Sequence, residues 1–102
     1  MRVEWTEPAL DDLTGIRDYI AEDSPENAHR FIERLFDAAE QLTDLPERGR
    51  QVPEAKREDV RELIFQSYRI IYRLKPQQVD ILTVIHGSRD LNRLAVKPWD
   101  AK

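Results

Sequence analysis

Cysteine is absent from this 102-residue chain, and the sequence holds only two histidines and three glycines. Without cysteine there are no disulfides and no thiolate metal ligands, and two histidines are too few for a typical zinc or iron site. The opening residues 1–10 contain no long apolar run, so we expect neither a secretion signal nor a membrane span, and hence a cytoplasmic location. The length predicts one domain over residues 1–102. Nothing in the sequence implies a cofactor.

Basic residues are scarce in the first half of the chain. Residues 1–47 carry 4 basic and 13 acidic side chains, a net charge of −9, whereas residues 48–102 carry 12 basic and 7 acidic ones, a net charge of +5. This asymmetry has two readings: the second half meets an anionic partner, or the charges only solubilise exposed helices. The overall charge of −4 argues against a protein that binds nucleic acid over its whole surface.

The first half has the patterns of a strand and two helices. Residues 2–6 alternate between apolar and polar side chains, which predicts a half-buried strand. Apolar residues at helical spacing predict one helix that follows Thr6 and ends at about Glu22, and another that starts at Pro25 and ends at about Asp44. The predicted N-caps are Thr6 and Ser24. The short connection between the helices predicts an antiparallel helical hairpin.

Residues 60–90 are rich in β-branched and aromatic side chains and contain two turn signals. They predict an antiparallel meander of three strands, residues 60–65, 68–75 and 79–86. A two-residue turn at Gln66-Ser67 places Phe65 opposite Tyr68. The fold class is therefore α+β, with the helical hairpin packed on one face of a small antiparallel sheet.

Strand parity separates the meander into two faces, because opposed residues share a face. One face is aromatic and aliphatic and should form the core under the helices; it carries Leu63, Phe65, Tyr68, Ile70, Tyr72, Leu74, Val79, Ile81, Thr83 and Ile85. The other face mixes aliphatic with charged residues and carries Glu62, Ile64, Arg69, Ile71, Arg73, Asp80, Leu82, Val84 and His86. No further long helix remains to cover this second face, so we predict that it binds a partner. Alternatively, Arg69 and Arg73 are structural, paired with Glu62 and Asp80.

The chain resembles the RelE/ParE superfamily of type II toxin–antitoxin toxins, and within it the ParE-like, or plasmid stabilisation, branch. Each matching motif is weak alone, but their order along the chain is specific. The motifs are Trp5, residues 12–13, 16–20, 45–50, 60–63, 68–73 and 81–90.

The resemblance implies a small growth-arresting toxin that a cognate antitoxin neutralises by tight binding. It implies that operator DNA is bound only through the antitoxin, that no membrane is involved, and that the complex could be a heterotetramer or the toxin a homodimer. ParE-like members poison DNA gyrase, and RelE-like members cleave mRNA on the ribosome. A third reading is a non-toxic co-repressor partner of the antitoxin.

The nuclease reading needs an acid–base group and cations for a phosphate. By resemblance to RelE-like nucleases, Arg69 and Arg89 would serve the phosphate, Lys56 would replace a lysine before the sheet, and His86 would be the acid or base. No tyrosine follows Tyr72, however, and a ribosome-bound nuclease must neutralise many phosphates. The sequence therefore favours a non-enzymatic gyrase inhibitor over an mRNA endonuclease.

The antitoxin should cover the second face of the sheet with an amphipathic segment whose acids pair with arginines. The predicted antitoxin-binding residues are Ile64, Arg69, Ile71, Arg73, Leu82, Val84 and Arg89. No metal ligand is predicted.

Overall fold

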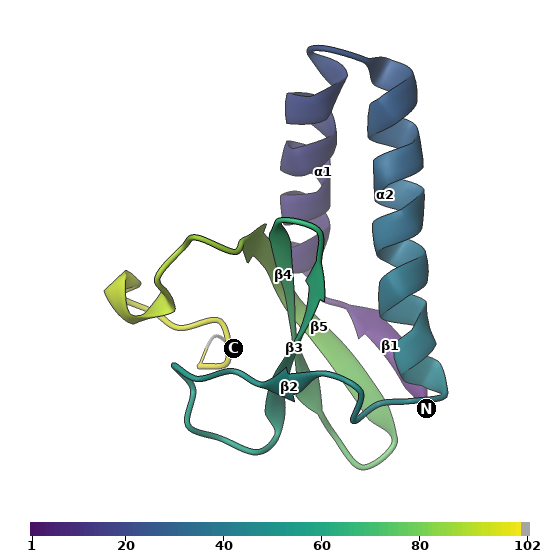
Figure 1. Ribbon diagram of the computed structural model, residues 1–102. Coiled ribbons are helices and arrows are strands. Elements are labelled where there is room, and N and C mark those ends of the chain that lie inside the picture. Colours follow the sequence, from purple (N-terminus) through teal and green to yellow (C-terminus); the bar gives the residue numbers. More distant parts are fainter. Residues whose placement is uncertain (101–102) are drawn as a thin grey trace.

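The structure is a computed structural model that describes residues 1–100, with two helices packed on a five-stranded sheet (Figure 1). The elements in chain order are β1 (Arg2–Trp5), α1 (Glu7–Ala21), α2 (Pro25–Glu40), the 3-10 turn η1 (Gln41–Thr43), β2 (Arg50–Gln51), β3 (Val60–Phe65), β4 (Tyr68–Leu74), β5 (Gln78–His86) and the 3-10 turn η2 (Leu91–Arg93). The strand order is β1-β5-β4-β3-β2. The α+β architecture is the predicted one. Within residues 1–100, no helix is both long and apolar enough to cross a bilayer.

Both helices begin at the predicted caps. The Thr6 side chain accepts a hydrogen bond from the Ala9 N–H at 3.4 Å, and the Ser24 side chain accepts one from the Asn27 N–H at 3.2 Å. These bonds satisfy backbone donors that have no partner inside the helix. The helical hairpin of α1 and α2 extends well beyond the tip of the β3–β4 hairpin (Figure 1), so the end where α1 connects to α2 does not lie over the sheet.

The predicted register of β3 and β4 is confirmed. Phe65 stands opposite Tyr68 and Leu63 opposite Ile70, around a two-residue turn. Gln66 has a φ of 51°, which agrees with a type II′ turn, where the first central residue takes a positive φ. That conformation is uncommon for a residue with a side chain and is imposed by the twist of the two strands.

The sheet is mixed, where the sequence predicted an antiparallel one. β1 pairs with β5 in parallel, with Arg2 opposite Gln78 and Trp5 opposite Ile81. The alternation of residues 2–6 predicted a half-buried strand but contained no information on its neighbour. β1 lies at the edge of the sheet beside β5, the last strand along the chain, so no tight turn joins the two strands and requires them to be antiparallel.

A β-bulge in β5 makes the predicted parity wrong for the end of this strand. Tyr72 pairs with Ile81 but Ile71 pairs with Thr83, so Leu82 is an extra residue. Beyond the bulge the side chains exchange faces. Val84 therefore lies in the core under the helices and Ile85 packs on the opposite side, the reverse of the prediction. His86, also predicted on the second face, instead stands opposite Tyr68, with ring centroids 5.6 Å apart.

Side chains at the start of α1 hold the bulge. The Thr6 hydroxyl contacts the Ile81 and Leu82 carbonyls at 2.6 and 3.2 Å. Asp12 Oδ2 accepts from the Val84 N–H at 2.9 Å and from the Thr83 hydroxyl. Because β1 ends at Trp5, this part of β5 has no strand beside it on that edge, and Asp12 supplies the acceptor that a strand would have provided.

Tyr72 fastens the loop after α2 to the sheet. Its ring is fully buried, its hydroxyl donates to the Pro46 carbonyl at 2.9 Å, and it accepts from the Gly49 N–H at 2.9 Å. A Cβ on Gly49 would stand 2.5 Å from the Tyr72 hydroxyl and 2.6 Å from the Glu62 carbonyl. Only glycine allows this close approach of loop, strand and ring.

Gly49 in the loop and Gly15 in α1 should respond in opposite ways to replacement by alanine. Gly49→Ala is expected to lower the free energy of unfolding by about 2 kcal/mol, because a backbone carbonyl and a buried ring must move. Gly15→Ala, in the middle of α1 with nothing within 4 Å of the added Cβ, is expected to raise it by about 0.5–1 kcal/mol. Urea unfolding of both variants checks this, and a Gly49→Ala variant as stable as the wild type would refute the packing account.

Candidate functional site

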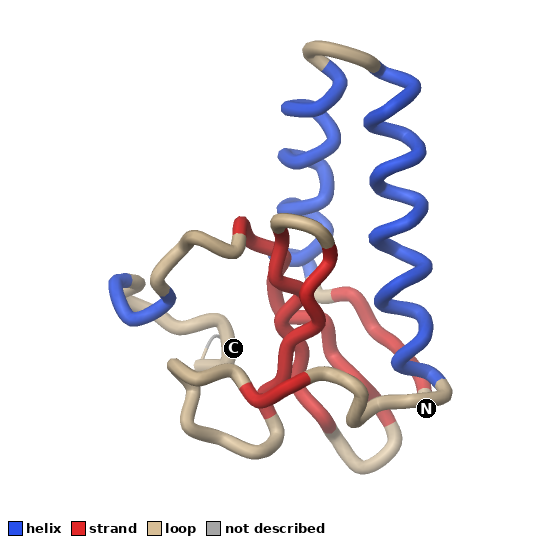
Figure 2. Tube along the Cα trace, viewed as in Figure 1, coloured by secondary structure: helices blue, strands red, loops and turns tan. Residues whose placement is uncertain are grey.

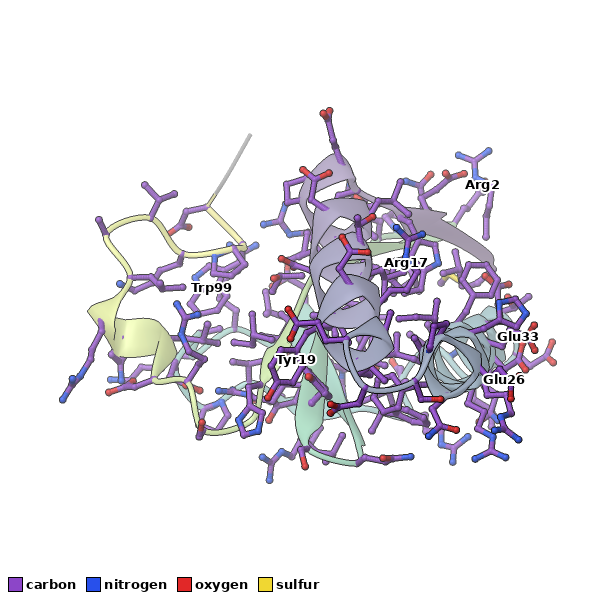
Figure 3. All side chains as sticks on the ribbon, turned by 90° about the horizontal axis from the view of Figure 1, so that it is seen from above. Arg2, Arg17, Tyr19, Glu26, Glu33 and Trp99 are labelled. Atoms are coloured by element: carbon purple, nitrogen blue, oxygen red, sulfur yellow. The ribbon has the colours of Figure 1, made fainter. Side chains whose placement is uncertain are left out.

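The sheet face opposite the helices is covered by the chain itself. The loop before β3 and the segment after β5 close over it, and Trp99 lies on the opposite side of the molecule from α2 (Figure 3). The buried residues of this second core are Val52, Val60, Ile71, Leu91 and Trp99, with Ala55, Leu82, Ile85 and Leu94 packed against them. The prediction of an uncovered face is wrong, because loops and the short 3-10 turn η2 cover it with a few apolar side chains and without an α-helix. Figure 2 shows these loop segments in tan and η2 in blue.

Arg69 lies on this covered face, and two carboxylates hold its guanidinium group. Its Nε donates to Glu62 Oε1 at 2.6 Å, and its two terminal nitrogens donate to the two oxygens of Glu54 at 3.0 and 2.8 Å. Its Nη1 also donates to the Arg89 carbonyl at 3.3 Å. Arg69 is only 6% exposed, so these charge-assisted bonds are shielded from water. The planar guanidinium group of Arg69, which could have bound a phosphate, is therefore already bound by the two carboxylates.

The two glutamates extend this network to neighbouring segments. Glu62 is 1% exposed, and its second oxygen accepts from Arg50 Nε at 2.7 Å. Glu54 accepts from the Leu91 N–H at 3.3 Å. The network therefore ties β4 to β3, to the short edge strand β2, to the loop before β3 and to η2.

The hydrogen bonds between Arg69 and Glu54 shift the pKa values of both groups. Those bonds lower the pKa of Glu54 from 4.5 to about 2, although burial acts in the other direction. The same bonds, with a further contribution from Glu62, raise the pKa of Arg69. Both groups stay charged at neutral pH.

Arg73 is also engaged within the chain, but not by the predicted partner. It stands opposite Asp80 in the register, yet its terminal nitrogen donates to the Trp99 carbonyl, and its Nε lies 4.0 Å from Asp59. Asp80 pairs with Lys75 at 2.6 Å instead. Arg73 thus helps to hold the C-terminal segment on the sheet.

The remaining predicted site residues differ in accessibility. Ile64 is 56% exposed, and Lys56, His86 and Arg89 have exposed side chains. His86 Nδ1 lies 2.8 Å from the Ser88 hydroxyl and accepts from the Ser88 N–H at 3.2 Å. Buried or half-buried positions are Arg69, Ile71, Arg73, Leu82 and Val84.

The structure brings only some of the predicted nuclease residues together. A shallow hollow of about 280 Å³ beside the β3–β4 turn is lined by Ile64, Arg69 and His86, but by neither Lys56 nor the Arg89 side chain. Within residues 1–100 there is also no cluster of three potential metal ligands. The predicted nuclease residues therefore do not all line this one hollow.

Sequence reasoning missed two residues that determine this site. Glu54 lies in a charged loop where nothing local marks it as the partner of Arg69, 15 positions away. Trp99 follows a proline in a segment without periodicity, yet it is only 6% exposed. Trp99 and the nearby Leu91 and Leu94 were the available signal that the segment after β5 packs on the domain.

Replacing Glu54 should change how stability depends on pH. A carboxyl with a pKa of about 2 in the folded chain and 4.5 when unfolded contributes stability above pH 4.5 that is lost as the pH falls toward 2. This difference corresponds to roughly 3 kcal/mol. Glu54→Gln is therefore expected to be less stable at pH 7 and to show a flatter decline between pH 5 and pH 2, as measured by urea unfolding.

Glu58→Gln is the matched control, since Glu58 lies in the same loop with an exposed side chain. It should keep the wild-type stability and pH dependence. An acid decline as steep in Glu54→Gln as in the wild type would contradict the assignment of the Arg69–Glu54 pair.

Residues 3–91 of the chain match the family described as the ParE toxin of the type II toxin–antitoxin system parDE. The chain is 42% identical over 88 residues to toxin RelE2 of Caulobacter vibrioides, covering 86% of this chain and 97% of that protein. It is 37% identical over 88 residues to putative toxin Y4kP of Sinorhizobium fredii, covering 84% and 88%.

Solved structures show the same likeness. The chromosomal ParDE system from P. aeruginosa superposes with a TM-score of 0.72 at 25% identity, covering 84% of this chain and 95% of that one. The toxin–antitoxin complex RelBE2 from Mycobacterium tuberculosis gives a TM-score of 0.59 at 25% identity, covering 83% and 95%. The resemblance inferred from the motifs is confirmed: the chain belongs to the ParE toxin family, within the RelE/ParE superfamily of type II toxin–antitoxin toxins.

Proposed function

We propose that this toxin acts on DNA gyrase and that its cognate antitoxin neutralises it by tight binding. The observation that carries the choice of target is the state of Arg69. A ribonuclease of this superfamily would use that arginine on the phosphate, but here the buried Glu62 and the half-buried Glu54 hold it. Releasing it would take from Glu54 its hydrogen-bonded arginine and would leave the buried Glu62 with Arg50 alone, which is unfavourable in a low-dielectric site.

The distribution of charge supports the same target. Several basic side chains of the second half are neutralised locally, by the pairs Arg50–Glu62, Arg57–Asp59, Lys75–Asp80 and Arg93–Asp90. The net charge already counts these acids, so the excess of +5 remains, but the pairs lower the number of basic side chains that are free to bind phosphates, and a ribosome-bound toxin needs many of them. Gyrase is a protein target and does not require a basic toxin.

Of the predicted antitoxin-binding residues, only those with accessible side chains can contact the antitoxin directly. Ile64 and Arg89 are exposed, whereas Ile71 and Val84 are buried in two different cores. An exposed isoleucine beside charged residues is a suitable anchor for a partner segment. Arg69 and Arg73 hold the segments that carry this surface in place. Arg69 does so through its bond to Glu62, and Arg73 through its bond to the Trp99 carbonyl.

Purified gyrase tests the target. The toxin is expected to block supercoiling of relaxed plasmid and to trap cleaved DNA, and prior mixing with the antitoxin encoded beside the toxin gene should abolish both effects. Supercoiling that proceeds at the normal rate in excess toxin would sink the gyrase proposal. Overexpression without the antitoxin should arrest growth; unchanged growth would instead support the non-toxic co-repressor.

The names of two relatives, RelE2 and RelBE2, favour mRNA cleavage as the second candidate. On that reading, codon-linked transcript ends should appear in cells that express the toxin. Arg89→Ala is the informative variant, because the Arg89 side chain is exposed and forms no hydrogen bond or ion pair within residues 1–100 whose loss would unfold the chain. Arg69→Ala cannot discriminate, since it removes the buried network. Full toxicity of Arg89→Ala without transcript cleavage would exclude the nuclease.

A further inference from the structure

Two adjoining hollows form a furrow between α2 and the end of β3. One has a volume of about 370 Å³ and is lined by Arg30, Phe31 and Arg34. The other has a volume of about 380 Å³ and is lined by Arg48, Arg50 and Ile64. They meet where the rings of Phe31 and Phe65, one from each hollow, pack edge to face at 5.4 Å. We call this the α2–β3 furrow.

The β3 backbone has an open edge in this furrow. The Val52 N–H donates to the Val60 carbonyl at 3.1 Å, and the Leu74 N–H donates to the Asp59 carbonyl at 2.7 Å. Val60 therefore directs its backbone groups toward β2, and Asp59 toward β4. Because these directions alternate along a strand, Ile64 directs its N–H and carbonyl to the same side as Val60.

No strand stands beside Ile64 in the part of the chain that the structure describes. β2 is two residues long, and its pairing with β3 reaches no further than Glu62. The end of β3 is thus an exposed sheet edge with a large apolar side chain, the arrangement to which an extended peptide adds as a further strand.

The walls of the furrow are basic in a half of the chain that is otherwise acidic. Arg30 and Arg34 are two of the four basic residues among residues 1–47 and stand one helical turn apart. Like charges at this spacing destabilise a helix, and within residues 1–100 neither arginine forms an ion pair with an acid. Glu26 and Glu33 lie on the side of α2 away from α1 (Figure 3). Arg34 and Arg48 form no side-chain bond within residues 1–100.

We propose that an extended, acidic segment of the antitoxin binds in the α2–β3 furrow by adding a strand to the open edge of β3. Its backbone pairs with the N–H and carbonyl of Ile64, and its carboxylates pair with Arg30 and Arg34. The proposal rests on the proposed neutralisation by an antitoxin. A helical segment would satisfy its own backbone and leave this edge unpaired. A second copy of the chain would bring its own arginines against these, so like charges disfavour it.

Proline at the edge tests the backbone pairing. Ile64→Pro removes an N–H that points away from β4, so the β3–β4 hydrogen bonds remain. It is expected to weaken binding of the full-length antitoxin encoded by the adjacent gene at least tenfold, measured by calorimetry, while Ile64→Val stays within twofold of the wild type. In the wild-type complex, hydrogen exchange of the Ile64 amide should slow at least tenfold. Unchanged exchange there would overturn the proposal even if Ile64→Pro failed to fold.

Charge reversal tests the walls of the furrow. The double variant Arg30→Glu/Arg34→Glu should weaken antitoxin binding at least tenfold, with a reduced dependence on salt. Arg2→Glu/Arg17→Glu makes the same change in net charge outside the furrow and should bind within twofold of the wild type. Equal binding by both double variants would overturn the proposal. These readouts use toxin and antitoxin alone, so a failure of gyrase inhibition would leave them interpretable, and the reverse also holds.

Discussion

The hydrogen bonds and ion pairs from Arg69 to Glu54 and Glu62 are the interaction on which the second half of the structure depends. It joins a central strand, an edge strand, an irregular loop and the segment after β5 around one buried guanidinium group. The buried charges of Arg69 and Glu62 and the half-buried charge of Glu54 are tolerable only when each is paired and hydrogen-bonded, so the segments that supply them must close together. The small apolar core of Val52, Ile71, Leu91 and Trp99 forms on the same face of the sheet.

The fold was predictable where the local pattern determined it. Helix caps, the hairpin and the register of β3 with β4 follow from residues close in sequence, and all are present. The parity of β5 was predicted correctly only as far as Leu82, because the bulge at Leu82 has no glycine or proline to mark it. It depends on Thr6 and Asp12, about 70 positions away, whose bonds replace those of a missing strand.

The candidate site was predicted less well for the same physical reason. Parity placed Ile64, Arg69 and Ile71 on one face, which the β3–β4 register bears out. It did not distinguish the exposed Ile64 from the buried Ile71, because the covering residues Val52 and Trp99 come from segments without periodicity. The diagonal pairing of Arg69 with Glu62 was an open alternative and is observed, whereas Glu54 could not be found without the closed loop.

Net charge by segment is a poor measure of what a surface offers to a partner in this protein. The basic half uses Arg69 and Arg73 to hold its own backbone and side chains, and several others meet acids nearby. The acidic half, by contrast, presents Arg30 and Arg34 to solvent on one face of α2. Because a charge attracts a partner only where it is neither buried nor already paired, Arg30, Arg34 and Arg48 supply accessible positive charge at the boundary between the two halves, in addition to the exposed Lys56 and Arg89. β3 ends at that boundary without a neighbouring strand. Unpaired backbone hydrogen-bonding groups and accessible positive charge therefore occur at the same place on the surface.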